Sequence, residues 1–342
     1  MKINPSPKNR PNFGGFLNNK ITLNALEKIA DHGASFSLGA SFVGAMALRP
    51  LAISLTPKTD KENKKYASIN SISSAAAKLL LAETIALPVE NAIKKINKNP
   101  KDFLNENTLK NFYPDKKSYS FLTQTIKQST NLLTAIPKSY LTVALIPVIA
   151  NKFFNKKEEE KKDIINPAIF KGMEKFSSFQ NISFTGKKIG LFESGISKIL
   201  NNETLQNFSK KHSPNSNNIA RDFSVISDIL LTGASIFHTK NSKKIKQERK
   251  NPLIYNNILS TTASILFGCA LDKLIQTSTK KSIENFKALN KNNPKLNKYI
   301  EGINILRPTV VFAFVYYGIL PIATTYFADK MDKNLNSKKS ES

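Results

Sequence analysis

Long apolar stretches alternate with polar connections along the whole chain. Six apolar segments stand out, each of about the 20 residues that a helix needs to cross a bilayer. They are Ala34–Leu55, Ser68–Ile93, Asn131–Phe154, Ile219–Phe237, Leu253–Ile275 and Ile303–Ala328. No stretch alternates apolar and polar residues over enough positions to predict a sheet. The pattern therefore predicts an all-α protein with six long apolar helices.

Two features of these segments favour a membrane over a soluble core. Pro308–Ala328 and Asn251–Leu271 each run for 21 residues without a charged side chain. Small residues also recur at every fourth position, namely Ser37, Ser41 and Ala45, and again Ser260, Ser264 and Gly268. In a membrane such stripes let helices pack closely, whereas in water small side chains bury little apolar area. We therefore expect the six helices to be membrane-embedded.

Landmarks of the first half of the chain return in the same order in the second half. A Phe-x-Gly at 13–15 recurs at 184–186, and amphipathic stretches follow at 26–29 and 196–199. Later pairs are 72–76 with 259–263, 89–93 with 271–275 and 146–148 with 320–322. The sequence thus predicts two homologous three-helix halves, residues 1–155 and 181–330, with a charged linker at 156–180 and a polar tail at 331–342.

Three crossings per half would place the second copy upside down relative to the first. Lys and Arg are divided almost evenly between the two sets of loops, so the positive-inside rule gives no orientation. Because inverted copies tend to equalise the two sides, we expect inverted halves. The longer connections contain helix-like stretches, Phe103–Phe112 and Lys281–Leu289, which we expect to lie along the surface.

The chain is strongly basic, and its basic residues are almost all lysines. The net charge is +26, and only five of the 51 basic residues are Arg. Arg suits bidentate recognition of phosphates and base edges, so a Lys-rich surface favours unspecific attraction to polyanions. The Lys-rich loops lack the interleaved aromatic residues of single-strand binders. Anionic lipid head groups of a bilayer are therefore the expected partner, and nucleic acid is not.

Residue types that carry catalysis or bind metals are sparse. The three histidines, His32, His212 and His238, are isolated, and none is spaced as a metal-ligand pair. The single cysteine, Cys269, excludes an intrachain disulfide and a CxxC metal site. No phosphate-binding glycine loop and no serine nucleophile motif is present. The sequence predicts a protein that is not an enzyme and has no metal or cofactor.

Ionisable residues inside the apolar segments are the candidate binding residues. A charge at the centre of a bilayer costs roughly 2.5–3.5 kcal/mol on insertion scales, so such a residue is paired, reaches an interface or lines a polar path. The candidates are Arg49, Lys78, Glu83, Lys138, Asp228 and Arg307.

For Arg49, two roles are open, a salt bridge to Asp228 or Glu83 and a position facing a ligand. Arg307 lies near the start of its segment and is expected to reach the membrane interface. Lys138, next to a proline, is expected to anchor a helix end, and Lys78 and Glu83 should face different sides of one helix.

Prolines fall within or near the ends of several segments. Pro88, Pro147 and Pro321 are expected to interrupt their helices, because proline lacks the N–H that would bond the preceding turn. Broken helices at corresponding positions of two halves are typical of binding sites in secondary transporters.

The run Pro88–Lys94 (PVENAIK) resembles the Pro-x-(Asp/Glu)-x-x-(Lys/Arg) signature of mitochondrial-type solute carriers. Its basic residue comes one place late, and the second half has Asp272 with neither the proline nor the basic partner. That family is also built from three repeats, each much shorter than the two here. The resemblance therefore transfers no site residue to this chain.

Two classes of function remain open from the sequence. The first is a multi-pass α-helical membrane protein with an internal duplication, acting as a non-enzymatic scaffold or a solute pathway. The alternative is a soluble, basic helical protein that binds anionic membranes or nucleic acid.

Overall fold

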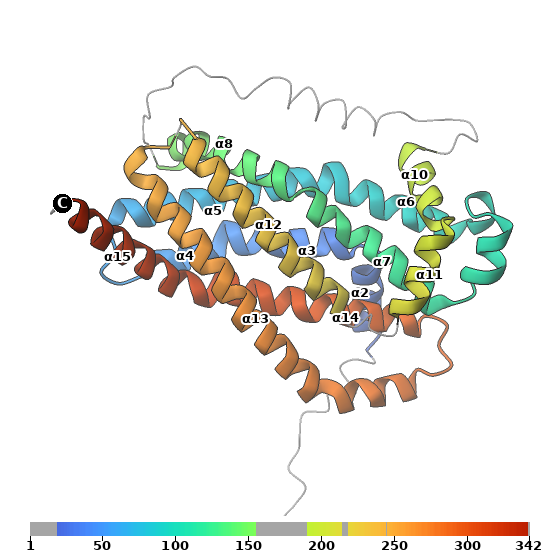
Figure 1. The fold of residues 1–342 in the computed structure, drawn as a ribbon. Helices are drawn as coiled ribbons and strands as arrows, with labels where there is room; N and C mark the ends of the chain where they lie inside the picture. The colour runs from blue at the N-terminus through green and yellow to red at the C-terminus, as the bar shows by residue number, and fades with distance from the viewer. Residues whose placement is uncertain (1–18, 155–189, 214–217, 244, 341–342) are drawn as a thin grey trace, which may run out of the picture.

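The computed structural model describes residues 19–154, 190–213, 218–243 and 245–340 (Figure 1). Within these ranges the chain is all-α, as predicted, and contains no strand. The α-helices are α2 (Lys20–Asp31), α3 (Gly33–Val43), α4 (Arg49–Ser54), α5 (Lys61–Leu81), α6 (Leu87–Lys98), α7 (Lys116–Leu133), α8 (Ala135–Phe154), α10 (Leu191–Leu200), α11 (Glu203–His212), α12 (Ile219–Asn241), α13 (Gln247–Leu289), α14 (Leu296–Ala313) and α15 (Leu320–Ser340). The Phe-x-Gly landmarks and the predicted linker 156–180 lie outside the described residues.

Polar side chains just before several helices explain where those helices begin. A carboxylate oxygen of Asp60 accepts a 2.9 Å hydrogen bond from the backbone N–H of Asn63 at the start of α5. Asp115 accepts one of 3.3 Å from the N–H of Ser118 at the start of α7. Such caps satisfy N–H groups that have no partner in the first helical turn. The long helices therefore begin in the polar connections.

Five continuous helical stretches of the described chain are long and apolar enough to cross a membrane. They are Gly33–Ser54, Lys61–Lys98, Lys116–Asn151, Gln247–Leu289 and Leu296–Asn334. The predicted segment Ile219–Phe237 forms α12, which is not among the five. Because the described chain also contains shorter helices such as α2, α10 and α11, it is not a plain six-helix arrangement.

Three helices contain a π-helical turn that ends two residues before a proline. These turns are Gly44–Leu48 before Pro50, Ala82–Ala86 before Pro88 and Phe314–Ile319 before Pro321. A wider turn accommodates a proline ring that would clash with the carbonyl four residues earlier. The helix is therefore irregular before Pro88 and Pro321, as predicted. Pro147, in contrast, lies inside α8 without an interruption, so that prediction was wrong.

The short helices expected in the two longer connections differ from the prediction. Lys281–Leu289 is the continuous end of α13, which runs on for 43 residues. In the other connection a π-helical turn covers only Thr108–Phe112. Phe103 and Phe112 are buried, 8% and 0% exposed, whereas the polar residues Asn105–Asn107, Lys110 and Asn111 are exposed, so this stretch lies along the surface, as expected, with its apolar side packed inward.

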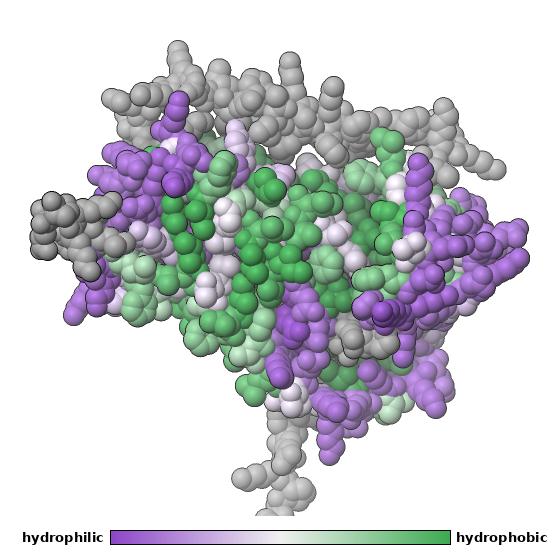
Figure 2. Space-filling model, viewed as in Figure 1, coloured by the Kyte–Doolittle hydropathy of each residue, from purple (hydrophilic) through white to green (hydrophobic). Residues whose placement is uncertain are grey.

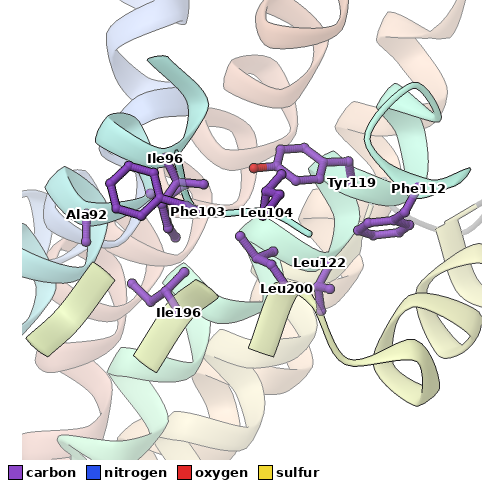
Figure 3. Packing of buried hydrophobic residues seen from close by; sticks show 10 residues of the cluster. Ala92, Ile96, Phe103, Leu104, Phe112, Tyr119, Leu122, Ile196 and Leu200 are labelled. Carbon is purple, nitrogen blue, oxygen red and sulfur yellow. The ribbon is translucent and has the colours of Figure 1, made fainter. Parts of the chain in front are cut away.

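Figure 3 shows how the apolar side chains of that connection are buried. Its apolar residues join α6, α7 and α10 in one cluster, in which Ile196 of α10 faces Phe103, and Leu200 of α10 lies next to Leu104. Each Å² of apolar surface that is removed from water contributes about 25 cal/mol to the stability of the fold. The cluster therefore fixes α10 of the second half of the chain on α6 and α7 of the first.

The first and the last long helical stretches run in the same direction. Gly33 lies against Ile305, and Ser37 Oγ is 3.0 Å from Thr309 Oγ1. Residue numbers thus increase together along the contact between α3 and α14. Both helices point from the α2 end of the bundle towards the end where α15 finishes (Figure 1).

α13 runs in the opposite direction to α14 and α15. Asn256 donates a 2.9 Å hydrogen bond to Thr325, whereas Asp272, further along α13, pairs with the earlier residue Arg307. Numbers rise along one helix as they fall along the other, so the two helices are antiparallel.

α12 is in turn antiparallel to α13. Thr232 is 2.6 Å from Thr261, and Arg221, nearer the start of α12, lies 3.6 Å from Asp272. It follows that α12 runs parallel to α14 and hence to α3. The first long helices of the two halves therefore have the same orientation, and the expected inversion was wrong.

The long helices pack in corresponding ways in the two halves. α5 packs against α3 and α8, and α13 packs against α12 and α15. Between the halves, α3 contacts α14, and α12 contacts α7 and α8. The first long helix of each half thus lies against the last one of the other half.

Large apolar side chains cover the outside of the bundle between its ends. In Figure 2 a hydrophobic band crosses the middle of the visible face, and hydrophilic residues gather towards its left and right. Exposed residues of this kind include Leu51, Ile229, Leu266, Phe267, Val310 and Phe314, each at least 52% exposed. The outer surface of the long helices is therefore apolar over much of their length.

Candidate polar site within the helix bundle

A polar cavity of about 50 Å³ lies between the long helices. Six long helical stretches, namely the five given above and α12, contribute to its lining. Representative lining residues are Arg49, Ser74, Thr142, Asp228, Thr261 and Tyr316. A volume of roughly 10–15 Å³ holds one water molecule, so the cavity has room for a few waters or one small solute.

Arg49 is one of the cationic residues of the cavity. Its side chain is 5% exposed, and Nη2 donates hydrogen bonds to Asn256 Oδ1 at 2.8 Å and to Ser260 Oγ at 3.1 Å. Its guanidinium carbon lies 4.5 Å from the centre of the Tyr316 ring, a cation–π distance. Arg49 makes no salt bridge to Asp228, so that part of the expectation was wrong, and the side chain of the other expected partner, Glu83, lies outside the described residues. Neutral polar groups and an aromatic face hold the guanidinium instead.

Lys78, Lys138 and Asp228 form a charged cluster beside Arg49. The Lys78 ammonium donates a hydrogen bond to the hydroxyl of Tyr317, and its Nζ lies 4.8 Å from the centre of that ring. Lys78 and Asp228 line the cavity, and both interact electrostatically with Lys138. Lys138 is only 8% exposed. It therefore belongs to the polar interior. The expectation that it anchors a helix end at the surface was wrong.

Arg307 forms a separate buried ion pair. Its Nε donates a 2.7 Å hydrogen bond to Oδ1 of Asp272, and the two side chains are 6% and 0% exposed. Arg221 also approaches the second carboxylate oxygen of Asp272, at 3.6 Å. Arg307 therefore does not reach an interface, and the prediction of such a position was wrong.

Glu90 is a second fully buried carboxylate, and it caps α3. Its Oε1 accepts hydrogen bonds from the backbone N–H groups of Ala34 at 2.7 Å and Ser35 at 3.1 Å. A negative charge is stabilising at a helix N-terminus because unpaired N–H groups point there. Glu90 and Asp272, two landmarks of the predicted repeat, thus each contact the first turn of the first long helix in their own half.

Polar contacts link the halves at both ends of the bundle. At one end, Arg249 Nη1 lies 3.1 Å from Asp60 and 2.7 Å from Asn63, whose amide nitrogen lies 2.6 Å from Asp329. The cavity lies between these contacts and the Arg307–Asp272 pair.

At the other end, Lys127 Nζ donates a 2.7 Å hydrogen bond to the carbonyl of Ala30 and lies 3.7 Å from Glu301. Lys298 pairs with Asp31 at 2.9 Å. These contacts close the bundle around α2 and α14.

The two stripes of small residues face other helices. Ser260 Oγ is 3.0 Å from Thr324 Oγ1, and a Cβ on Gly268 would lie 2.8 Å from the ring of Phe312. The backbone carbonyl of Ala45 accepts a 2.6 Å hydrogen bond from Ser71. Small side chains at these positions allow close approach of the helices.

The structure thus brings together four of the six predicted site residues, namely Arg49, Lys78, Lys138 and Asp228. Glu83 lies in a π-helical turn, and its side chain is outside the description. Sequence reasoning missed Tyr316, Tyr317 and Asn256, because a tyrosine or asparagine in an apolar stretch carries no charge to mark it. Asp272 was recognised only as a landmark of the repeat.

No three His, Cys, Asp or Glu side chains come together as a possible metal site in the part of the chain that the structure describes. Comparison with known proteins gives no family model, curated protein or solved structure that matches this chain.

Proposed function

We propose that this chain is a multi-pass membrane protein whose six long helical stretches enclose a binding cavity on a pathway for a small solute. Its role is non-enzymatic. The observation that carries the proposal is the distribution of polarity, with apolar side chains outside the bundle and charged side chains inside it.

This distribution is the reverse of that in a soluble protein. Leu266, Phe267 and Phe314 are 65%, 57% and 60% exposed, whereas Arg49 and Lys78 are each 5% exposed. Soluble proteins rarely expose large continuous apolar patches, and they almost never bury charges that are not paired. Lipid contact accounts for the outside, and a polar path accounts for the inside.

The proposal includes an internal duplication with two parallel halves. It is supported by the corresponding packing of the long helices and by Glu90 and Asp272, which contact corresponding helix starts. Two parallel copies related by an axis along the bundle place a shared cavity at their interface. Movement of either copy can then open or close the cavity to solutes.

Anionic lipid head groups are the proposed partners of the bundle ends. The connections Lys58–Lys65 and Lys240–Lys250 are rich in lysine and join long helices at one end. Each basic residue close to an anionic membrane contributes roughly 1 kcal/mol of attraction. Attraction to anionic lipid therefore accounts for the positive charge of the chain without a nucleic-acid partner.

Fractionation tests the membrane assignment. Membranes containing the protein are washed with 1 M salt and then with alkaline carbonate. We expect the protein to stay in the pellet, because apolar burial is not screened by salt, whereas binding through lysines alone is. Release by salt would support the soluble alternative, a basic protein held on anionic surfaces.

Cysteine labelling tests the cavity as a solute pathway. On a Cys269→Ser background, Ser74→Cys should react with Ag⁺ added outside lipid vesicles, because Ser74 lines the cavity and this thiol reagent is small enough to enter it. Leu266→Cys, on the apolar outside, should not react, because a thiol in hydrocarbon stays protonated. Rapid labelling of Leu266→Cys, or none of Ser74→Cys, would contradict the proposal.

A further inference from the structure

The charges around the cavity are unbalanced. Two cationic side chains, Arg49 and Lys78, line it together with one carboxylate, Asp228. A third basic residue, Lys138, does not line the cavity itself but lies directly behind the lining residue Thr142, whose hydroxyl donates a 2.7 Å hydrogen bond to the backbone carbonyl of Lys138. The described ionisable groups at this site thus comprise three basic side chains and one acidic side chain.

The hydrogen-bonding capacity of this cluster is also only partly used. Arg49 and Lys78 donate to Asn256, Ser260 and Tyr317. The Lys138 ammonium and the Asp228 carboxylate, in contrast, make no hydrogen bond to another residue in the described ranges. A buried ammonium carries three donors and is costly without acceptors, so Lys138 favours an acceptor that brings negative charge.

We propose that the cavity binds a small anion, with Lys78 and Lys138 as its main electrostatic partners. This inference rests on the proposed function, because it names the solute class of the same cavity. The hydroxyl group of Ser74 in the lining supplies a donor that suits an anion lacking a fixed planar geometry, whereas the Thr142 hydroxyl donates to the carbonyl of Lys138. Lysine acts as a point charge and does not demand the bidentate geometry that arginine offers.

The size of the cavity limits the anion. About 50 Å³ admits an anion of the size of chloride or formate, and excludes a sugar acid such as gluconate. Asp228 opposes binding because its carboxylate competes for the same cations. Opposite charges a few ångströms apart still interact by several kcal/mol at the effective dielectric constant of a protein, so the competition is large enough to measure.

Equilibrium binding of radiolabelled formate to the purified full-length protein in detergent tests this inference, with gluconate as the background anion. The wild type should bind formate saturably, and chloride should compete. Lys138→Met should weaken binding about tenfold or more, and Asp228→Asn should tighten it by a similar factor, which is the effect of a change of 1.4 kcal/mol. Lys330→Met, an exposed lysine away from the cavity, is the matched control and should bind like the wild type.

Three results of these binding measurements would contradict the proposed anion site. No saturable binding by wild type, equal binding by Lys138→Met and Lys330→Met, or weaker binding by Asp228→Asn would overturn the anion site. If Lys138→Met does not fold, Ser74→Ala and Lys138→Arg replace it, and they should weaken and retain binding, respectively. A protein that resists carbonate and is labelled at Ser74→Cys but binds no anion would keep the proposed function and lose only this inference.

Discussion

Arg49 Nη2 donates a 2.8 Å hydrogen bond to Asn256 Oδ1, which joins two residues that lie 207 positions apart in the chain. The bond links the first long helix of one half to the middle helix of the other, directly beside the cavity. Asn256 passes the interaction on to Thr325 of α15 through a 2.9 Å hydrogen bond. A single guanidinium therefore holds three helical stretches in register.

Arg49→Met should destabilise the folded protein by about 2 kcal/mol, because buried hydrogen bonds to a charged group are lost. Thermal unfolding in detergent measures the change. Arg249→Met, which removes a more exposed arginine at the bundle end, should cost less than about 1 kcal/mol. In a double-mutant cycle with Asn256→Ala, additive losses would show that the two residues are not coupled.

Arg307→Met should be more damaging, since it leaves the fully buried carboxylate of Asp272 with only the longer contact to Arg221. Removing one partner of a buried ion pair costs roughly 3–5 kcal/mol. The double variant Asp272→Asn, Arg307→Met should recover part of this loss, which can be followed by the yield of folded protein and its unfolding temperature. A variant Arg307→Met as stable as Lys273→Met, an exposed neighbour, would refute the role of the pair.

Gly302→Ala should disrupt the contact between α2 and α14. A Cβ at this position would lie 2.3 Å from the backbone oxygen of Leu26, and backbone atoms cannot move aside as a flexible side chain can. We expect a loss of about 2 kcal/mol or more. Gly39→Ala is the matched control in another long helix, because nothing lies within 4 Å of its added Cβ. It should be neutral or slightly stabilising, as for alanine in a helix interior. Equal unfolding temperatures for the two variants would disprove the close contact.

Asp115, in the polar connection before α7, gives a pH-dependent contribution. A side-chain hydrogen bond from Ser118 lowers the pKa of Asp115 below its usual value. Because the folded state favours the charged form, this stabilisation is complete above the usual pKa and is lost as the pH falls through the lowered one.

Asp115→Ala should cost about 1 kcal/mol at neutral pH, as for the loss of an N-cap. Asp115→Asn keeps an acceptor but cannot titrate, so its unfolding temperature should depend less on pH below 4 than that of the wild type. Parallel pH curves for the wild type and Asp115→Asn would contradict this prediction.

The positions of the long helices could be predicted because apolar length is a local property. Arg49, Lys78, Lys138 and Asp228 were also found from the sequence, since a charge inside an apolar stretch is costly and marks a polar interior. Their partners could not be predicted. Arg307 and Asp272 lie on separate helices, and although both fall within predicted apolar segments, no local signal connected the two.

The relative orientation of the halves is also invisible in the pattern. The apolar periodicity of a helix is the same whichever way the helix runs, and counting three segments per half led to the wrong alternative. Contacts such as those of Ser37 with Thr309 and Thr232 with Thr261 were needed to establish the directions.

The parallel arrangement has a consequence for sidedness. α2 begins at one end of the bundle and α15 finishes at the other (Figure 1). If the bundle crosses a bilayer, Lys20 and Lys330 face different compartments, although an even number of long stretches would ordinarily return the chain to its starting side. An impermeant reagent added to sealed, uniformly oriented vesicles would then reach one of these lysines and never both. A solute gradient across the membrane would therefore expose the two ends of the chain to different solute concentrations.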